Sequence, residues 1–232
     1  MVANSTVRDH VQSAGTVLTV HVKNVMVNES NFWVLYGMHT EPTFVEGTGH
    51  MFQQAQRDAS LRYVRRWRNA LDVGANVGQW TRPLAKKFKQ VICFEPNPNF
   101  RDCFNMNIAE TNVTLHPYGL SNHEHTVTQG FNATHLNDTL GDTTPRDGDI
   151  QCRTLDSFNI TDVDYIKIDI DGFEIPMLQG AEKTLRKNNP VINIEMKERK
   201  RPTIVIQCRQ LLHDYGYACH SRVKSDEVWL KS

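Results

Sequence analysis

The sequence lacks the features of a membrane-spanning, secreted or nucleic-acid-binding protein. No apolar run reaches the ~18 residues that a membrane-spanning helix requires. The 26 Lys and Arg residues are balanced by 26 Asp and Glu residues, so no net charge attracts nucleic acid or an anionic membrane. The N-terminus has no charged region leading into an apolar stretch and a small-residue cleavage site. We therefore expect no membrane span, no nucleic-acid partner and no secretion.

Cysteine is also scarce, and its spacing is not that of a disulfide or zinc protein. The five cysteines are an odd number and form no CxxC or CxH pair. A disulfide framework and a zinc site are therefore both disfavoured, and a reducing cytoplasm is the expected location. These cysteines are Cys93, Cys103, Cys152, Cys208 and Cys219.

What the sequence does contain, from Asn69 onward, is a regular alternation of short apolar runs and helical stretches. A chain of 232 residues has room for one full domain with elaborations. Apolar residues at helical spacing predict helices over 98–110, 174–187 and 203–215. Strands that alternate with helices form right-handed βαβ units, so we predict an α/β fold with a mostly parallel sheet and helices on both faces. The tail predicts two strands joined by a turn, an antiparallel hairpin at one edge. The expected strands are NALDV, QVICFEP, NVTLHP, DYIKIDI and PVINIEM.

Two segments lie outside this pattern. Residues 1–68 predict an N-terminal extension packed on a core domain of 69–232, with a strand or hairpin over 17–27 and a helix over 51–68. A polar stretch, 122–150, is too long for an idle loop and is predicted to lie on the substrate side of the site. The helix ends in a basic run, which we interpret as a solvated helix face or, alternatively, as a contact for phosphate or an anionic substrate. That run is Arg62, Arg65, Arg66 and Arg68.

The segment LDVGANVG, followed by QVICFEP, indicates a nucleoside-containing ligand. Gly74 and Gly78 remove the Cβ atoms where a ligand must approach the backbone of a strand–turn–helix unit. Asp72 stands where a dinucleotide fold has its first glycine, and a carboxylate there repels phosphate but suits an ammonium or sulfonium group. Glu95 ends the next strand, where a carboxylate can accept hydrogen bonds from ribose hydroxyls. S-adenosylmethionine satisfies these conditions; the alternative is a tight turn with two satisfied carboxylates.

Over residues 69–196 the chain resembles the FkbM family of S-adenosylmethionine-dependent methyltransferases. The resemblance rests on DVGANVG, CFEPNP, TLDSF, DYIKIDIDGFEIPMLQGAEKTL and PVINIE in this order. It implies a class I methyltransferase fold, Rossmann-like with a seven-stranded sheet. It also implies O-methylation of a hydroxyl on a sugar, a glycan or another small molecule. The implied cofactor-binding residues are Asp72, Gly74, Asn76 and Gly78 for the methionine moiety, Glu95 and Pro96 for the ribose, and Gly119 and Ser121, within Tyr118–Ser121, for the adenine.

Two positions depart from the family pattern. Pro83 falls where the family usually continues its first helix, so we expect that helix to begin late, with Thr81 as its N-cap. Asp171 replaces the glutamate of a motif more often written D-x-E-G, which keeps the charge and shortens the reach.

The candidates for chemistry are Lys167, Asp169 and Glu195. Lys167 and Asp169 are two apart on one strand and point to the same face of the sheet, beside the expected cofactor site. Glu195 ends the neighbouring strand and is expected to join them. An alternative is a structural Lys167–Glu195 ion pair with Asp169 capping the next loop, and a further one is a Mg²⁺ ion held by Asp169 and Glu195. Of these interpretations, we favour catalysis without a bound metal.

Other side chains could serve as the general base or indicate another substrate. His116, His123 and His125 cluster after the third apolar run and have the right intrinsic pKa for proton transfer at neutral pH. A ribose 2′-O-methyltransferase acting on RNA would use a Lys-Asp-Lys-Glu set, of which Asp169, Lys197 and Glu227 could be members. The third hypothesis is a regulator that binds the cofactor without turnover. The sequence gives no indication of the oligomeric state.

Overall fold

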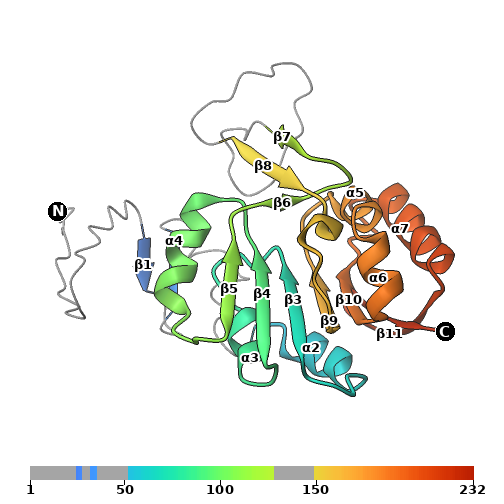
Figure 1. Ribbon diagram of the computed structural model, residues 1–232, viewed down its shortest axis with the longest axis horizontal. Helices are drawn as coiled ribbons and strands as arrows, with labels where there is room; N and C mark the ends of the chain where they lie inside the picture. The colour runs from blue at the N-terminus through green and yellow to red at the C-terminus, as the bar shows by residue number, and fades with distance from the viewer. Residues whose placement is uncertain (1–24, 28–31, 36–51, 128–148) are drawn as a thin grey trace.

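The computed structural model describes residues 25–27, 32–35, 52–127 and 149–232. At its centre lies a seven-stranded sheet of order β11-β12-β10-β9-β3-β4-β5 (Figure 1). Strands β5, β4, β3, β9 and β10 pair in parallel, and β12 pairs antiparallel with both β10 and β11. The predicted parallel sheet and C-terminal hairpin are therefore confirmed. The strands are β3 (Asn69–Val73), β4 (Gln90–Phe94), β5 (Val113–His116), β9 (Val163–Ile168), β10 (Val191–Glu195), β11 (Tyr217–Val223) and β12 (Asp226–Lys231).

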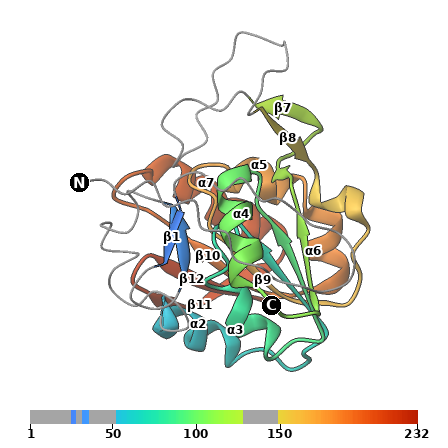
Figure 2. The ribbon, with the colours of Figure 1, turned by 90° about the vertical axis from the view of Figure 1, so that its left-hand side faces the viewer.

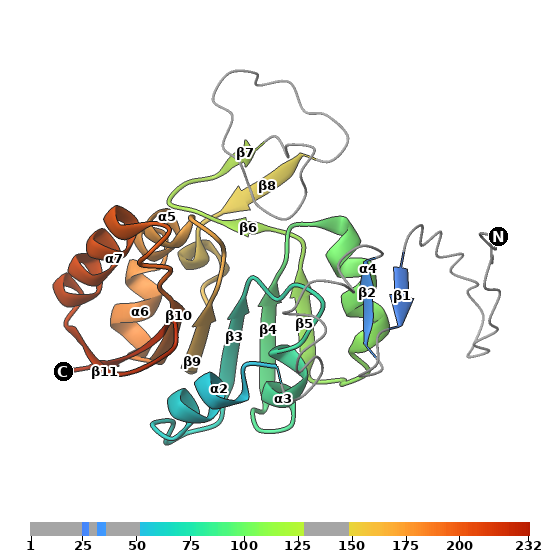
Figure 3. The ribbon, with the colours of Figure 1, turned by 180° about the vertical axis from the view of Figure 1, so that it is seen from behind.

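Helices cover both faces of this sheet. Figure 3 shows α2 and α3 in front of β3 and β4, whereas α6 lies in front of the sheet in the opposite view of Figure 1. Strand β9 shows why both faces are apolar, since Tyr165 belongs to the cluster under α2 and α3 while Ile166 and Ile168 belong to the one under α5, α6 and α7. The helices are α2 (Gln54–Leu61), α3 (Thr81–Ala85), α4 (Pro98–Asn107), α5 (Glu174–Gln179), α6 (Glu182–Asn188) and α7 (Pro202–Asp214), with a short 3-10 turn at Leu155–Phe158.

Two smaller sheets flank the central one. Strands β6 (Gly119–Leu120), β8 (Ile150–Arg153) and β7 (His125–Val127) form a three-stranded sheet of order β6-β8-β7, which projects beyond the carboxyl ends of the parallel strands (Figure 2). Strands β1 (Val25–Val27) and β2 (Trp33–Leu35) pair antiparallel beside α4. Asn107 fastens β2, because its side chain accepts from the Trp33 amide at 2.7 Å and donates to the Trp33 carbonyl at 3.0 Å.

The structure corrects several predicted boundaries. The helix expected over 51–68 ends at Leu61, so the basic run does not lie on a helix face. The helix expected over 174–187 is interrupted at Gly180, because a Cβ there would lie 2.0 Å from the Ser121 carbonyl oxygen and the chain must pass close to that backbone. Thr81 is the first residue of α3 rather than its N-cap, and its hydroxyl bonds to Asp72 instead. Most of the predicted strand at 17–27, and residues 128–148 of the predicted insertion, lie outside the described residues.

No helix in the described part of the chain is both long enough and apolar enough to cross a membrane.

Candidate active site

The turn that follows β3 approaches the neighbouring strands closely. The amides of Gly74 and Ala75 both donate to the Phe94 carbonyl, at 3.0 and 3.1 Å. Gly74 has a φ of +80°, and a Cβ added to it would lie 2.0 Å from the carbonyl oxygen of Asp169. Gly78 has a φ of +94° and would place a Cβ 2.8 Å from the side chain of Ile108. Only glycine therefore fits at either position.

Asp72 lies fully buried beneath this turn. Its Oδ2 accepts a 2.6 Å hydrogen bond from the Thr81 hydroxyl, and its Oδ1 lies 3.5 Å from the Lys167 Nζ. Burial raises the pKa of Asp72, while Lys167 and the Thr81 hydroxyl oppose the rise. The carboxylate thus joins the start of α3 to the central strand β9.

Lys167 occupies the centre of this polar group. Its Nζ donates to the Gly74 carbonyl at 2.9 Å and lies 3.9 Å from Asp169 Oδ2. Burial alone would lower the pKa of Lys167, but Asp72, Asp169 and more distant carboxylates outweigh it and raise the pKa. The ion pairs of Lys167 are therefore with Asp72 and Asp169, and the alternative of a direct Lys167–Glu195 pair is wrong.

Glu95 is held at the end of β4 by backbone amides. Its Oε2 accepts from the Asn76 amide at 2.8 Å and its Oε1 from the Asn97 amide at 2.9 Å. Burial raises the pKa of Glu95 to about 7, against the lowering effect of these two hydrogen bonds. Each oxygen keeps a further lone pair for a ligand. Asn76 stands at a positive φ of 50°, which aims its amide at the carboxylate.

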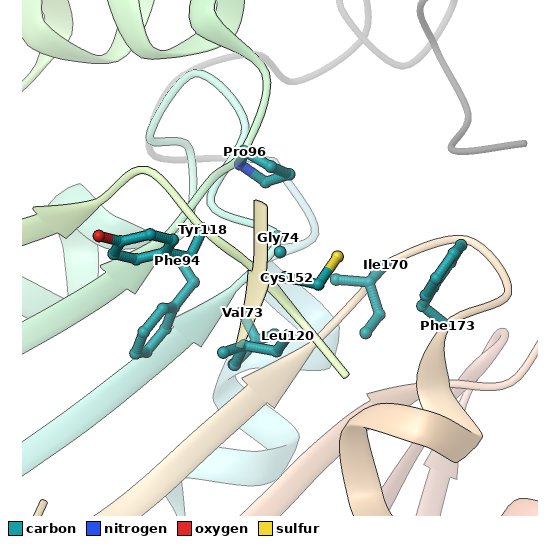
Figure 4. Close-up of a pocket in the computed structure, with 10 residues that line it drawn as sticks. Val73, Gly74, Phe94, Pro96, Tyr118, Leu120, Cys152, Ile170 and Phe173 are labelled. Atoms are coloured by element: carbon teal, nitrogen blue, oxygen red, sulfur yellow. The ribbon is translucent and has the colours of Figure 1, made fainter. Parts of the chain in front are cut away.

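Beside Glu95 opens a pocket at the carboxyl ends of β3 and β4. Phe94 and Tyr118 lie on one side, Ile170 and Phe173 on the other, and Gly74 lies between them (Figure 4). The lining is almost entirely apolar, which suits a flat heterocycle. The remaining lining residues are Val73, Pro96, Gly119, Leu120 and Cys152.

Sequence reasoning missed part of this lining. Cys152 comes from β8, beyond the polar insertion, and meets the pocket only because β8 pairs with β6. A Cβ on Gly119 would lie 2.9 Å from the Cys152 Sγ, so Gly119 permits that pairing. The turn after Asp171 brings Phe173 into the lining of the pocket. The only sequence signal for this turn is the neighbouring Gly172. Ser121, a predicted cofactor contact, is buried with its amide bonded to the Arg153 carbonyl, and it is not among the lining residues.

Next to the pocket, Asp169, Asp171 and Glu195 bring one carboxylate oxygen each within 4.8 Å of one another. The Lys197 ammonium lies 2.5 Å from Asp171 Oδ1 and 2.7 Å from Glu195 Oε2, so despite its shorter side chain Asp171 reaches this partner. Burial and the Asp169 carboxylate raise the pKa of Glu195 to about 8. The three predicted catalytic residues are thus brought together, and Lys197, which the sequence suggested only for the RNA alternative, lies beside them.

A second opening lies at the carboxyl end of the neighbouring strand β10. Glu174, Glu195, Lys197 and Arg201 supply its charged lining, and Arg201 lies 3.5 Å from Asp171. Burial raises the pKa of Glu174, whose Oε1 accepts from the Gly172 amide at 2.9 Å. Polar groups of both signs therefore surround the approach to Asp169.

The three histidines do not join this cluster. His116 stacks on Phe94, with ring centroids 5.2 Å apart, and burial lowers its pKa. His123 and His125 are exposed or half-buried and stack on each other at 4.3 Å. Within the described residues, none forms a hydrogen bond with Asp169 or Glu195.

Glu227, a member of the Lys-Asp-Lys-Glu alternative, is also engaged elsewhere. Its buried carboxylate accepts from Arg209 at 2.6 Å and from Arg222 at 2.5 Å. The structure therefore does not group it with Lys197 and Asp169.

The strand order, the glycine turn after β3 and the acidic residue ending β4 define a class I methyltransferase fold. The family model described as the methyltransferase FkbM domain matches residues 72–219, well over half of the chain. The chain belongs to the FkbM methyltransferase family. No curated protein matches it by sequence.

Several solved structures are similar to this chain over about three quarters of its length, at low sequence identity. One is methyltransferase FkbM from Methylobacillus flagellatus KT, with 20% identity, a TM-score of 0.49, and coverage of 73% of this chain and 46% of that chain. Precorrin-6y C5,15-methyltransferase from Geobacter metallireducens GS-15 has 15% identity and a TM-score of 0.45, covering 75% and 85%. An S-adenosylmethionine-dependent methyltransferase from Aquifex aeolicus has 15% identity and a TM-score of 0.46, covering 75% and 87%. The chain thus spans less than half the length of the first of these structures.

Proposed function

We propose that this protein is an S-adenosylmethionine-dependent O-methyltransferase that acts on a hydroxyl of a sugar, a glycan or another small molecule. The observation that carries the proposal is the buried Glu95 carboxylate, fixed by two backbone amides at the rim of an apolar pocket. A carboxylate in this position suits a ribose, and the aromatic lining beside it suits an adenine. Family membership supports the same conclusion.

The residues present fit this cofactor. Glu95 would accept the ribose hydroxyls, the backbone of Gly74–Gly78 would border the methionine moiety, and the pocket between Phe94 and Phe173 would take the adenine. When bound, the cofactor supplies a methyl group activated by a sulfonium. Asp72 carries its negative charge under the turn, where it would favour a cationic ligand, although the carboxylate itself is fully buried.

Asp169 is the residue we propose as general base. Its side chain is 25% exposed, compared with 12% for Glu195 and 5% for Lys167, so it is the most accessible of the three to an acceptor. Lys167 lies on the same face and would hold the Asp169 carboxylate in place, which orients the oxygen that accepts the hydroxyl proton. Glu195, whose pKa is raised to about 8, would hydrogen-bond the acceptor.

The substrate side is the least defined part of the proposal. Strands β7 and β8 pair at the two ends of the polar insertion and stand above the pocket, so residues 122–150 remain our candidates for acceptor recognition (Figure 2). The extension formed by 1–68 is proposed to pack on the core, as α2 does on β10 and β11. None of the five cysteines forms a disulfide, and we propose a reducing cytoplasm as the location.

Incubation with methyl-labelled cofactor and a panel of sugars, glycolipids, small phenols and RNA tests the function. We expect label in a hydroxyl-bearing small molecule or glycan, located by mass analysis as a methyl ether. Label only in RNA would replace the proposed acceptor class, and cofactor binding without any labelled product would indicate a regulator.

A further inference from the structure

Two turns lie side by side at the amino ends of the parallel strands, away from the pocket. Residues 62–68 follow α2, and residues 86–89 follow α3. The Lys89 amide donates to the Trp67 carbonyl at 2.9 Å, and the Gln90 amide donates to the Arg68 carbonyl at 3.0 Å. The parallel strands begin at these turns and end at the pocket, so the turns and the candidate active site lie at opposite ends of the strands (Figures 1 and 3).

These two turns are strongly basic and carry no acidic residue, and we call their surface the basic end. The first contributes four arginines and the second three lysines. Asp162 and Asp164 reach this end, and both are bound by Arg68. The other six cations are exposed, and no carboxylate among the residues that the structure describes lies within 4.0 Å of them. They are Arg62, Arg65, Arg66, Lys86, Lys87 and Lys89.

The backbone of the basic end is anchored from below. The Trp67 ring packs on Phe88, with centroids 5.0 Å apart, and the Lys87 ammonium lies 5.7 Å from the Trp67 centroid. The Asn112 side chain donates to the carbonyls of Ala85 and Phe88, each at 2.9 Å. These contacts hold the backbone that carries the six cations in place. Trp67 is half-buried, and its contacts with Phe88 and Lys87 restrict the stacking of a nucleic-acid base on its ring.

The basic end carries a local excess of positive charge although the net charge of the molecule is zero. At the opposite ends of the strands, charges of both signs lie together, with Asp171 and Glu195 beside Lys197. A local excess of charge orients a protein in the field of a charged surface even when the net charge is zero. The field of an anionic leaflet decays within a Debye length, so it acts on the end that faces it.

We propose that the basic end docks the protein on an anionic lipid surface. The cations are spread over two adjoining turns, and the Trp67 ring beside them packs on Phe88, so a lipid surface fits better than a nucleic-acid strand, which needs exposed rings for stacking. Docking in this way points the candidate active site away from the bilayer. The acceptor would then be taken from the aqueous phase and not from the headgroups to which the protein is bound.

Co-sedimentation with vesicles tests the proposal on the full chain. We expect binding to vesicles of phosphatidylcholine mixed with phosphatidylserine, loss of binding in high salt, and no binding to phosphatidylcholine alone. The triple variant Lys86→Gln, Lys87→Gln, Lys89→Gln removes half of the exposed cations and should weaken binding about 100-fold. The matched control is Lys183→Gln, Arg199→Gln, Lys200→Gln, which removes three exposed cations outside the basic end and should bind as the parent does.

The outcomes separate the possibilities. Equal weakening by both triple variants would reduce the effect to net charge and overturn the proposal, as would failure of the parent to bind anionic vesicles at low salt. Binding to RNA in filter assays, with no binding to vesicles, would assign the basic end to nucleic acid instead. Melting temperatures of the variants close to that of the parent exclude misfolding as the cause. None of these readouts depends on methyl transfer, so the result stands whether or not the proposed function does.

Discussion

At the scale of single residues, the site is organised by backbone hydrogen bonds and buried charge. The glycine turn and the acidic residue beside it could be predicted from sequence because their signals are local: Gly74, Gly78 and Glu95 fall within one strand–turn–helix–strand unit. What local spacing could not give is the environment of Asp72, which is fully buried against Lys167 and Thr81. Its partners come from β9 and α3, and only the register of β3 against β9 brings Lys167 beside it.

Replacing Glu95 by Ala should weaken binding of S-adenosylmethionine and of its demethylated product about 100-fold or more. The change removes two charge-assisted hydrogen bonds, each worth about 1.5–3 kcal/mol. Titration calorimetry measures the effect, with NAD as a ligand expected not to bind. Because Glu95 also accepts from Asn76 and Asn97, the variant Glu95→Gln serves as control for the turn geometry. An unchanged dissociation constant in Glu95→Ala would place the ribose elsewhere.

Replacing Asp169 by Asn should lower turnover by about 10²–10⁴-fold, since that is the usual cost of losing a general base. The side chain keeps its shape and is partly exposed, so the melting temperature and the cofactor affinity should change little. Single-turnover rates measure the effect. Asp169 could instead act with Asp171 and Glu195 as a metal ligand. A chelator added to the parent distinguishes this alternative from a general base, because it would reduce turnover only if a metal takes part. Turnover within a few-fold of the parent would make Asp169 structural and direct the search to Glu195.

At the scale of helices and strands, the alternation of apolar runs and helical stretches predicts the strands of the sheet but not the breaks between helices. The runs NALDV and PVINIE were predicted as strands and are β3 and β10. The break between α5 and α6 was missed because the sequence around Gly180 keeps its helical spacing of apolar residues. Distant contacts meet at this break: Gly180 passes close to the Ser121 carbonyl, and its own carbonyl accepts from the Asp156 amide at 2.9 Å. No local pattern reports such contacts.

Gly180→Ala tests that account of the junction. A Cβ at this position would lie 2.0 Å from the Ser121 carbonyl oxygen, so the backbone of one segment must move. Overpacking of this kind costs about 1–3 kcal/mol of unfolding free energy. Urea unfolding measures it, and Lys187→Ala, at an exposed position of α6, should change stability by less than about 0.5 kcal/mol. Equal stability of the two variants would mean that the α5–α6 break has another origin.

At the scale of the whole molecule, the carboxyl edge of the sheet concentrates carboxylates that are costly to ionise. Burial is the main reason that the pKa of Glu95 is raised to about 7, that of Glu195 to about 8 and that of Asp226 to about 6. Asn193 is buried with Asp226 and donates to its Oδ2 at 2.8 Å, so this group lies deep under the candidate site. A site that tolerates such a cost is typical of ligand binding, where a partner group repays it.

These raised pKa values set the direction of the pH dependence of folding. A carboxyl with a higher pKa in the folded than in the unfolded state binds more protons when folded, so stability falls as pH rises from about 4.5 towards about 8. We expect the ligand-free protein to lose a few kcal/mol of unfolding free energy between pH 5 and pH 8, measured by urea unfolding at each pH. Asp226→Asn, which keeps the shape but cannot ionise, should flatten the part of the profile near pH 6. A stability that instead rises over this range would show that the carboxyls are ionised at little cost in the fold.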